Sequence, residues 1–390
     1  MKILLFGSQI TIGGAQRVLL DQADWFHSQG QEVMAVFYYD KDGLAEHWQR
    51  QHPFPIHVLA SYQAGSPVAN ALRLSQAVLH LRSVIREFQP DVIETFTHDA
   101  TLFGLPVAAG LNVPVRVAAH HGQFKSLSPL KQKLHSALIN SNACDRLVCV
   151  SERALNQALA ERCKREKISL IYNGIRPIEK NAQLRAETRK ALNLNDSDQL
   201  VLNVGRLVPE KAQQLLVQAA ADVIRQVPNA RFAIAGEGPL RESLQNQIEE
   251  LELTGRFRLL GNRDDIPALL NAADLFVLYS ETEGMPISLM EAMSVGLPVI
   301  ASDLEGCRSL IQDAESGVLL PFGYVEQLAE AIVERLTADS AVNMEMGQRA
   351  ALTIRTEFTL ERSLNKMLAL FEDIQRKKSG HRRSRPNRHF

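Results

Sequence analysis

The chain has 390 residues, of which 45% are apolar and 22% charged, and its formal net charge at pH 7 is −1. This length predicts two domains, and the composition excludes a disordered or fibrous chain. No stretch approaches the roughly 18 apolar residues of a membrane-spanning helix, and the start is too weakly apolar for a signal peptide. The four cysteines form no Cys-x-x-Cys pair, which excludes a disulfide framework and indicates a reducing compartment. We therefore expect a cytoplasmic protein.

Charge is distributed unevenly along the chain. Residues 1–180 carry 19 basic and 15 acidic side chains, residues 181–375 carry 17 and 29, and residues 376–390 carry seven and none. This asymmetry supports two separate units. Because only the short tail is strongly basic, we expect no nucleic-acid partner. The tail, 376–390, is poor in apolar residues and is predicted to be disordered.

Short apolar, β-branched runs alternate with helical patterns along almost the whole chain. This alternation predicts parallel sheets with crossover helices, and therefore an α/β fold. Most of the runs are apolar throughout, as expected for strands covered on both faces. The predicted strands are 2–6, 33–37, 91–95, 115–119, 147–150 and 169–172, then 200–204, 232–235, 257–260, 275–279, 298–301 and 317–320, and the clearest helices are 16–27, 67–88, 212–226, 240–251 and 325–336.

The alternating pattern occurs twice, with a polar break near 176–183. It predicts two doubly wound, Rossmann-like domains, 1–176 and 177–359. In open α/β sheets, ligands bind beyond the carboxyl ends of the strands. We therefore expect the site in a cleft between the two domains.

The stretch SETEGMPISLMEAMSVG, residues 280–296, combines carboxylates with a helix start. The loop after the strand 275–279 holds Glu283 and Gly284, and a glycine lets the backbone come close to a ligand. Glu283 and Glu291 are eight positions apart, so both carboxylates can edge one cleft and accept hydrogen bonds from neighbouring sugar hydroxyls. The alternative is a surface loop with ordinary helix-starting acids. Pro286 fits the first helical turn, and the amides that form an anion site there are those of Ile287, Ser288 and Leu289.

The stretch NVGRLVPEK, residues 203–211, is a second strand, glycine turn and helix start. It places Arg206 and Lys211 at the carboxyl edge of the second sheet, where their charges can pair with a diphosphate. A solvated ion pair with Glu210 is the alternative. Because this half of the chain is acidic, a nucleotide must be held there by close contacts, not by long-range attraction.

Other glycine turns and histidines follow predicted strands. Gly-x-Gly at 236–238 is a weak signal, and its missing third glycine argues against a dinucleotide fingerprint. In the first half, Gly13 and Gly14 follow the first strand and allow a close backbone approach to a phosphate or sugar. A histidine can bond a sugar hydroxyl or a developing phosphate charge, although a single histidine is more often structural. Those at strand ends are His98, His120 and His121.

Together these motifs resemble glycosyltransferase family 4, the retaining nucleotide-sugar transferases of GT-B fold. The resemblance runs from Lys2 to about Phe371, and its second-half strings are the more specific. One departure is Tyr279, where many members have proline. The matching strings are Gly13-Gly14-Ala15-Gln16-Arg17, His121-Gly122, Asn173-Gly174-Ile175, Gly205-Arg206-Leu207 through Lys211, Gly236-Glu237-Gly238-Pro239, and Glu283-Gly284-Met285-Pro286 through Glu291-Ala292-Met293.

The resemblance implies a role for each matched residue. Arg206 and Lys211 hold the donor diphosphate, and Glu291 holds the ribose hydroxyls. Glu283 and the amides from Met285 to Leu289 hold the donor sugar and distal phosphate. Further implied donor contacts are Gly13, Gly14, Gly205, Gly236 and Gly238, with the base against Asn262 and Arg263. His121 lies near the transferred sugar, with His98 and His120 as further sugar or acceptor contacts. The last helix, about 360–374, crosses back onto the first domain.

The implied reaction is transfer of a sugar, with retention, from a nucleotide diphosphate to a hydroxyl acceptor. A UDP-sugar donor is favoured, and the acceptor is expected to be a glycan or lipid-linked saccharide in lipopolysaccharide or polysaccharide biosynthesis. Positive side chains and helix amides supply the charge, so no metal or other cofactor is expected. The alternatives are a metal-dependent transferase using Asp40 and Asp42, a nucleotide-sugar epimerase, and a non-enzymatic sugar-binding protein.

Residues 125–140, KSLSPLKQKLHSALIN, place four leucines (127, 130, 134 and 138) on one helical stripe, with Lys131, Lys133 and His135 nearby. Such a stripe more often faces a core, but a basic amphipathic helix can lie on anionic lipid. The cations of 376–390 add to this attraction. A peripheral position on the inner face of the plasma membrane is the resulting hypothesis.

Overall fold

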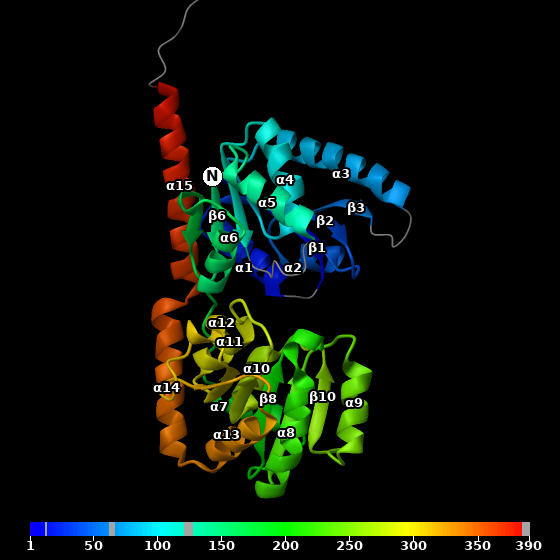
Figure 1. Ribbon diagram of the computed structural model, residues 1–390, viewed down its shortest axis with the longest axis vertical. Coiled ribbons are helices and arrows are strands. Elements are labelled where there is room, and N and C mark those ends of the chain that lie inside the picture. Colours follow the sequence, from blue (N-terminus) through cyan, green and yellow to red (C-terminus); the bar gives the residue numbers. More distant parts are fainter. Residues whose placement is uncertain (12–13, 62–66, 121–127, 384–390) are drawn as a thin grey trace, which may run out of the picture. The chain divides into compact units, whose positions relative to one another are not determined.

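The computed structural model describes residues 1–11, 14–61, 67–120 and 128–383. The chain divides into two compact units (Figure 1). Unit 1 is Met1–Gly174 together with the C-terminal segment from Leu360, and unit 2 is Ile175–Thr359. The expected boundary at 176/177 therefore lies two residues later than the division in the structure.

Unit 1 is built on a seven-stranded parallel sheet in the order β3-β2-β1-β4-β5-β6-β7. Five of the six predicted strands reappear within a few residues, and the sixth is shorter. The edge strand β3 was not predicted, since its six residues mix polar with apolar side chains. The strands are β1 (Lys2–Ile10), β2 (Glu32–Asp40), β3 (Ile56–Ser61), β4 (Val92–Thr95), β5 (Val115–His120), β6 (Arg146–Cys149) and β7 (Ile168–Leu170).

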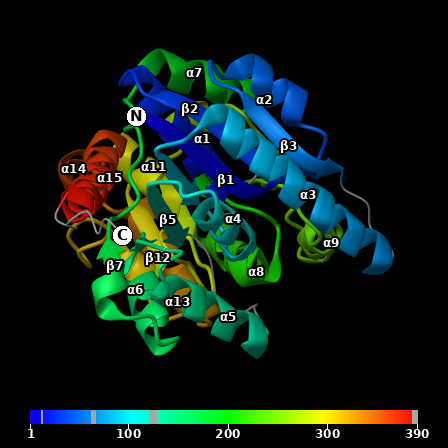
Figure 2. The ribbon, with the colours of Figure 1, turned by 90° about the horizontal axis from the view of Figure 1, so that it is seen from above.

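Helices cover both faces of this sheet, so the strands are apolar on both sides. One face packs against α3 to α6, with Phe6, Ile93 and Leu147 in the shared core (Figure 2). On α1, the ring of Phe26 lies 6.0 Å from that of Phe371 of α15, with the two ring planes tilted by 41°. The helices are α1 (Gly14–Ser28), α2 (Ala45–Gln51), α3 (Pro67–Phe88), α4 (His98–Gly110), α5 (Pro129–Asn140), α6 (Glu152–Ala160) and α15 (Leu360–Arg383), with a short 3₁₀ helix η2 (Arg165–Lys167).

The C-terminal helix extends further than the sequence predicts. It was expected to end near 374 and to be followed by a disordered tail from 376, but α15 continues to Arg383. Asp373 pairs with Lys377 at 2.6 Å, one turn on. Lys378 donates to Asp145 at 2.6 Å and to the carbonyl of Pro114 at 2.8 Å, which fixes the helix against unit 1. These partners explain why the basic segment is helical here; 384–390 lie outside the described residues.

Unit 2 is built on a six-stranded parallel sheet in the order β10-β9-β8-β11-β12-β13. Helices α8, α9 and α13 contribute to the core on one face. All six predicted strands are present, and the prediction of two doubly wound α/β domains is confirmed. The strands are β8 (Gln199–Val204), β9 (Ala230–Ala235), β10 (Phe257–Gly261), β11 (Leu275–Leu278), β12 (Val299–Ser302) and β13 (Val318–Leu320). The helices are α7 (Ala182–Ala191), η3 (Pro209–Lys211), α8 (Gln213–Gln226), α9 (Arg241–Glu250), α10 (Ile266–Ala272), α11 (Ile287–Val295), α12 (Glu305–Arg308), α13 (Val325–Thr337) and α14 (Ser340–Glu357).

A carboxyl group lies fully buried in the central strand β4. Glu94 is inaccessible to solvent, and neither of its oxygens has a hydrogen-bond partner among the described residues. Burial penalises the charged form and raises the pKa of Glu94 to about 8. The carboxyl is therefore mostly protonated at neutral pH.

This burial predicts how stability depends on pH. Between the ordinary pKa of 4.5 and the folded value of about 8, the folded state holds a proton on Glu94 that the unfolded state has lost. Stability contributed by this proton is complete below pH 4.5 and is lost as the pH rises towards 8. Glu94→Gln removes that loss, so we expect it to stabilise the protein at pH 7 by on the order of 2–3 kcal/mol.

Thermal unfolding of both proteins at pH 5, 6, 7 and 8 measures this difference. Glu32→Gln on β2 is the matched control, because the Glu32 side chain is exposed. A gap between Glu94→Gln and wild type that does not widen from pH 5 to 8 contradicts the assignment.

Candidate functional site

Two loops at the carboxyl edge of the unit 2 sheet are joined by an ion pair. The Nζ of Lys211, after β8, donates to Oε1 of Glu283, after β11, at 2.7 Å. The side chains are 19% and 8% exposed, so the pair is largely shielded from water. The backbone N–H of Glu281 also donates to the carbonyl of Glu210 at 3.0 Å. Lys211 is thus paired with Glu283. The alternative hypothesis, a solvated ion pair with Glu210, named a different partner.

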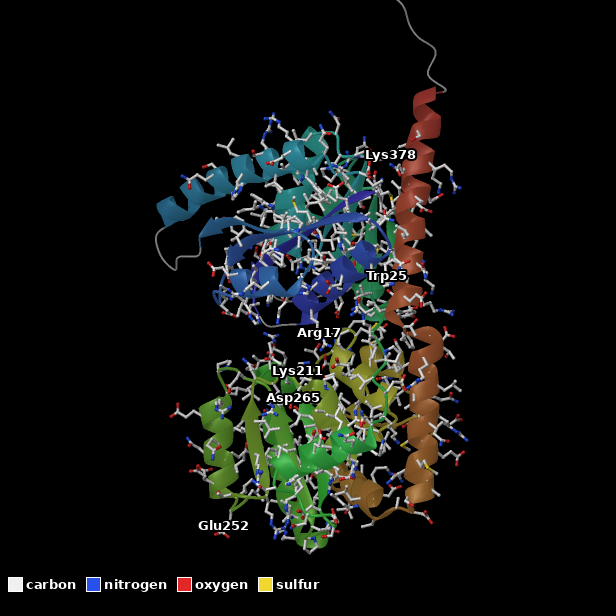
Figure 3. The ribbon with its side chains drawn as sticks, turned by 180° about the vertical axis from the view of Figure 1, so that it is seen from behind. Arg17, Trp25, Lys211, Glu252, Asp265 and Lys378 are labelled. Carbon is white, nitrogen blue, oxygen red and sulfur yellow. The ribbon has the colours of Figure 1, made fainter. Side chains whose placement is uncertain are left out.

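The β8 loop places Lys211 through a sharp change of backbone direction. Lys211 ends η3, and Ala212 follows in the left-handed conformation with φ of 48° before α8 begins. The Nε2 of Gln213 donates to the carbonyl of Arg206 at 2.9 Å and fixes the loop. Arg206 is exposed, and no described residue forms an ion pair with it. Figure 3 shows Lys211 at the same end of unit 2 as Asp265, opposite Glu252.

The glycines after β9 pack against the β8 loop. Gly236 has φ of 148°, and a Cβ there would lie 2.0 Å from the carbonyl oxygen of Gly205. A Cβ on Gly238 would lie 2.3 Å from the carbonyl oxygen of Leu207. Only glycine allows this close approach of two backbones. The structure thus gives Gly205, Gly236 and Gly238 a packing role that the sequence reading, which placed them at the donor, did not foresee.

Helix α11 starts beside Glu283, as predicted. It begins at Ile287 after Pro286, which offers no side-chain hydrogen bond to cap it. A helix start uncapped by a side chain directs backbone donors and the positive end of its dipole towards an anion. Glu291, one turn into the helix, is buried with 3% exposed. The donors of this turn belong to Ile287, Ser288 and Leu289, next to Met285.

The loop that carries Glu283 rests on α12. A Cβ on Gly306 would lie 2.3 Å from the carbonyl oxygen of Gly284 and 3.1 Å from that of Glu283. Gly284 itself has open space around its Cβ position. The next thiol, Cys307, is buried, and its pKa is raised by that burial and by the charge of Glu283. Sequence reasoning did not identify this support.

Two other predicted positions lie in unit 2. Asn262 and Arg263 follow β10, two strands away from β8 at the same edge. The guanidinium of Arg263 holds Asp265 through two bonds of 2.8 and 2.6 Å, which raise the pKa of the arginine. Tyr279, the departure from the family pattern, is buried, and its hydroxyl binds the carbonyl of Pro321 and accepts from the N–H of Tyr324 at 3.0 Å. It therefore holds the loop after β13.

Unit 1 holds a cavity of about 120 Å³ at the ends of β4 and β5. The predicted contacts His98 and His120 both line it, together with Thr97, whose side chain caps α4 by accepting from Ala100 at 3.2 Å. Gly14 begins α1 with open space around it, and the next residue, Ala15, lines the cavity. Gly13 and His121 lie outside the described residues.

A third histidine lines the same cavity, although the sequence analysis did not predict it to be buried. His135 on α5 was grouped with the basic residues near an apolar stripe, but its side chain is buried with 2% exposed. Its ring lies 4.7 Å from that of His98. The sequence did contain a sign of this burial, because His135 lies four residues, about one helical turn, before Ile139, which is fully buried.

The carboxylates of the metal-dependent alternative have structural partners. Asp40 accepts from the backbone N–H groups of Leu44 and Ala45 at 3.1 and 2.8 Å, at the start of α2. Asp42 accepts from the hydroxyl of Thr11 at 2.6 Å. Within the described ranges, no group of three or more His, Cys, Asp or Glu side chains is placed to hold a metal ion.

Known proteins resemble this chain over both units. Family models described as "Glycosyltransferase Family 4" and "Glycosyl transferases group 1" match residues 12–178 and 185–353. An Escherichia coli UDP-Gal:alpha-D-GlcNAc-diphosphoundecaprenol alpha-1,3-galactosyltransferase is 30% identical over 77% of this chain and 79% of its own length. The chain belongs to glycosyltransferase family 4.

Further relatives and solved structures resemble this glycosyltransferase over most of its length. The putative glycosyltransferase EpsD of Bacillus subtilis is 26% identical over 83% of this chain and 90% of its own length. The crystal structure of Anabaena HepE in complex with UDP-glucose has a TM-score of 0.84 at 23% identity, covering 96% of this chain and all of that one. WaaG, a glycosyltransferase of lipopolysaccharide biosynthesis, gives 0.75 at 18%, covering 95% and 99%. The fold is therefore GT-B. Because the chain belongs to a family of glycosyltransferases, the non-enzymatic and epimerase alternatives are set aside.

The contact between α12 and the Glu283 loop generates a prediction. In Gly306→Ala the new methyl group cannot fit 2.3 Å from the Gly284 oxygen, so the loop must move and the Lys211–Glu283 pair with it. We expect glycosyl transfer to fall by about tenfold or more, because small displacements at a site are costly. Gly110→Ala is the control, since a Cβ there meets nothing within 4 Å. Equal transfer rates in the two variants contradict this role of α12.

Proposed function

We propose that this glycosyltransferase moves a sugar, with retention at the anomeric carbon, from a UDP-sugar to a hydroxyl of a lipid-linked saccharide or glycan during envelope polysaccharide assembly, without a metal ion. The observation that carries the proposal is the Lys211–Glu283 pair at the carboxyl edge of the unit 2 sheet. It places a cation and a carboxylate, the two groups that a diphosphate-sugar needs, within one hydrogen bond of each other.

The donor diphosphate binds Arg206, Lys211 and the amides at the start of α11. Cleavage of the sugar–phosphate bond leaves charge on the diphosphate while the sugar becomes oxocarbenium-like. Cations and amides already in position stabilise that charge as it develops. Glu283 accepts hydrogen bonds from the sugar hydroxyls, and Glu291 accepts them from the ribose. Attack occurs on the face that the diphosphate leaves, and a donor phosphate oxygen takes the acceptor's proton.

The remaining donor contacts follow the family pattern. The base lies against Asn262 and Arg263, whose guanidinium is held in place by Asp265. Gly205, Gly236 and Gly238 keep the β8 and β9 loops close together, so that the backbone approaches the nucleotide. The family pattern also assigns donor contacts to Gly14, which begins α1, and to Gly13 and His121, which lie outside the described residues.

The donor and acceptor classes are supported by the relatives. The E. coli relative uses UDP-Gal and a saccharide on diphosphoundecaprenol. The Anabaena structures contain UDP and UDP-glucose. A uridine diphosphate donor is therefore favoured for this chain. The acceptor hydroxyl enters the unit 1 cavity, where His98 and His120 contact it.

Metal independence is supported by how charge is supplied. Arg206, Lys211 and the α11 amides already provide positive charge for the diphosphate. Asp40 and Asp42, which the alternative assigns to a metal, accept hydrogen bonds from α2 and from Thr11.

A peripheral membrane position at the inner face of the plasma membrane suits a lipid-linked acceptor. The outer face of α5 exposes Leu130 (67%) and Leu134 (53%), with Lys131 and Lys133 beside them. Leu138 instead packs partly against the core. Each lysine near an anionic surface contributes roughly 1 kcal/mol. In the part of the chain that the structure describes, no helix is long and apolar enough to cross a bilayer.

The central prediction concerns Lys211. Removing its charge takes away one of the cations proposed to stabilise the developing diphosphate charge, and breaks the ion pair with Glu283. We expect Lys211→Ala to lower turnover by about three orders of magnitude. Release of UDP from a panel of UDP-sugars, with and without acceptor, measures this. Lys190→Ala on α7 is the control, as an exposed lysine of the same unit. Near-wild-type turnover of Lys211→Ala refutes the proposal.

The same assay tests the metal requirement. Full turnover in excess EDTA supports a donor held by side chains and amides alone. Loss of turnover in EDTA, restored by Mg²⁺ or Mn²⁺ and abolished in Asp40→Asn, favours the metal-dependent alternative.

The exposed face of α5 gives a separate prediction. We expect the double variant Leu130→Ser/Leu134→Ser to bind vesicles containing phosphatidylserine about tenfold more weakly, because two apolar side chains no longer enter the lipid. Co-sedimentation measures the binding. Leu352→Ser on α14 is the control, since Leu352 is 62% exposed in unit 2. Deleting 384–390 separately measures the tail, and unchanged binding of the double variant removes α5 from the proposal.

A further inference from the structure

Three imidazole rings from three elements meet at the unit 1 cavity. His98 begins α4, His120 ends β5, and His135 lies in the middle of α5. The ring of His98 lies 4.7 Å from that of His120, at 84°, and 4.7 Å from that of His135, at 61°. His98 is thus held edge-on between two other rings, an arrangement that aromatic quadrupoles favour.

Burial keeps the rings of His98 and His135 uncharged. The pKa of His98 falls to about 4, because of burial and then because of the nearby charge of Lys131. The pKa of His135 falls to about 3, because of burial and then because of His98. A neutral imidazole carries one N–H donor and one acceptor nitrogen, which matches a hydroxyl group that both donates and accepts. The cavity is therefore suited to a sugar hydroxyl rather than to a phosphate.

Helix α5 fixes the position of His135 over the first turn of α4. Lys131, one turn before His135 on the same face, reaches Asp99 at 3.3 Å. Ser128 caps the helix by accepting from the N–H of Lys131 at 3.4 Å. Ile139, one turn after His135, is fully buried in the core. The ring of His135 is therefore anchored on both sides along its helix.

We propose that His135 is a positioning residue for acceptor recognition: its ring holds the ring of His98 in the plane from which a nitrogen meets the acceptor hydroxyl. This rests on the proposed function, in which His98 contacts the acceptor. A cavity of roughly 150 Å³ can hold a benzene ring, so the 120 Å³ here admits the hydroxyl-bearing edge of a sugar. His135 therefore orients His98, the hydrogen-bond partner of the acceptor hydroxyl, without contacting the donor.

Two substitutions separate the ring contact from the rest of the side chain. His135→Leu removes the ring, and His135→Phe keeps an aromatic ring that can contact His98 edge-on. With UDP-galactose and a short-chain GlcNAc-diphospho-polyprenol as probes, we expect His135→Leu to raise the acceptor KM about tenfold. The donor KM and acceptor-independent release of UDP stay within about twofold, because the proposed donor contacts include neither His98 nor His135. His135→Phe is expected to stay close to wild type. An unchanged acceptor KM in His135→Leu, or equal impairment in His135→Phe, overturns the proposal.

A second measurement is independent of activity. In full-length protein labelled at histidine, NMR of the His98 ring is expected to give one sharp signal in the wild type and in His135→Phe, and a broadened or split signal in His135→Leu. His27→Leu, at an exposed histidine of α1, is the control. A sharp single signal in His135→Leu overturns the proposal.

The two measurements also distinguish this inference from the proposed function. If the wild type binds UDP but transfers no sugar to the probe, the proposed acceptor class fails, while the NMR signal still decides the role of His135. His135→Gln is made in parallel as a second variant without the ring. If both ringless variants lose their circular dichroism while His135→Phe keeps it, His135 acts in packing alone and the proposal is overturned.

Discussion

The candidate donor site depends on one largely buried ion pair, Lys211 with Glu283, which joins the loops after β8 and β11. Taking two charges out of water is costly, and removing either partner leaves an uncompensated charge. The pair therefore holds both loops at a fixed distance before any ligand arrives. In the proposed function, each group then exchanges its partner for a group of the donor, a phosphate for the lysine and a hydroxyl for the glutamate. Such preorganisation is the main source of electrostatic stabilisation in catalysis.

Close backbone packing holds the loops that carry Lys211 and Glu283 in place. Gly236 and Gly238 contact the β8 loop, and Gly306 contacts the Glu283 loop, each at distances that exclude a side chain. The loops after β8, β9 and β11 are thus joined to one another, by backbone contact and by the ion pair. The cost is borne by glycines with little freedom to vary. A sequence shows such glycines, but it does not show whether each approaches a ligand or a neighbouring loop.

The sequence was sufficient for the fold and for placing the predicted unit 2 residues at one edge of the sheet, because both depend on local patterns. Apolar runs fixed the strands of doubly covered sheets. The order of strand, loop and helix placed Lys211, Glu283 and α11 at one edge. What could not be predicted depends on tertiary partners. The edge strand β3 has too few apolar residues to stand out, and the basic end of α15 is helical because Lys378 finds Asp145 and Pro114.

In helix α5, the spacing of residues along the sequence does not by itself show which face of the helix is buried. Leu130, Leu134 and Leu138 are spaced for one stripe, while His135 and Ile139 make a second stripe one position further round. Only the neighbouring α4 decides that the second stripe is buried and that Leu130 and Leu134 are exposed. The consequence is chemical, because burial lowers the pKa of His135 to about 3 and so keeps its ring neutral beside His98. Unit 1 thereby offers uncharged partners for a hydroxyl, while unit 2 offers the charges that a diphosphate needs. The proposed division of the reaction, with the acceptor at unit 1 and the donor at unit 2, thus follows from which polar groups each unit buries.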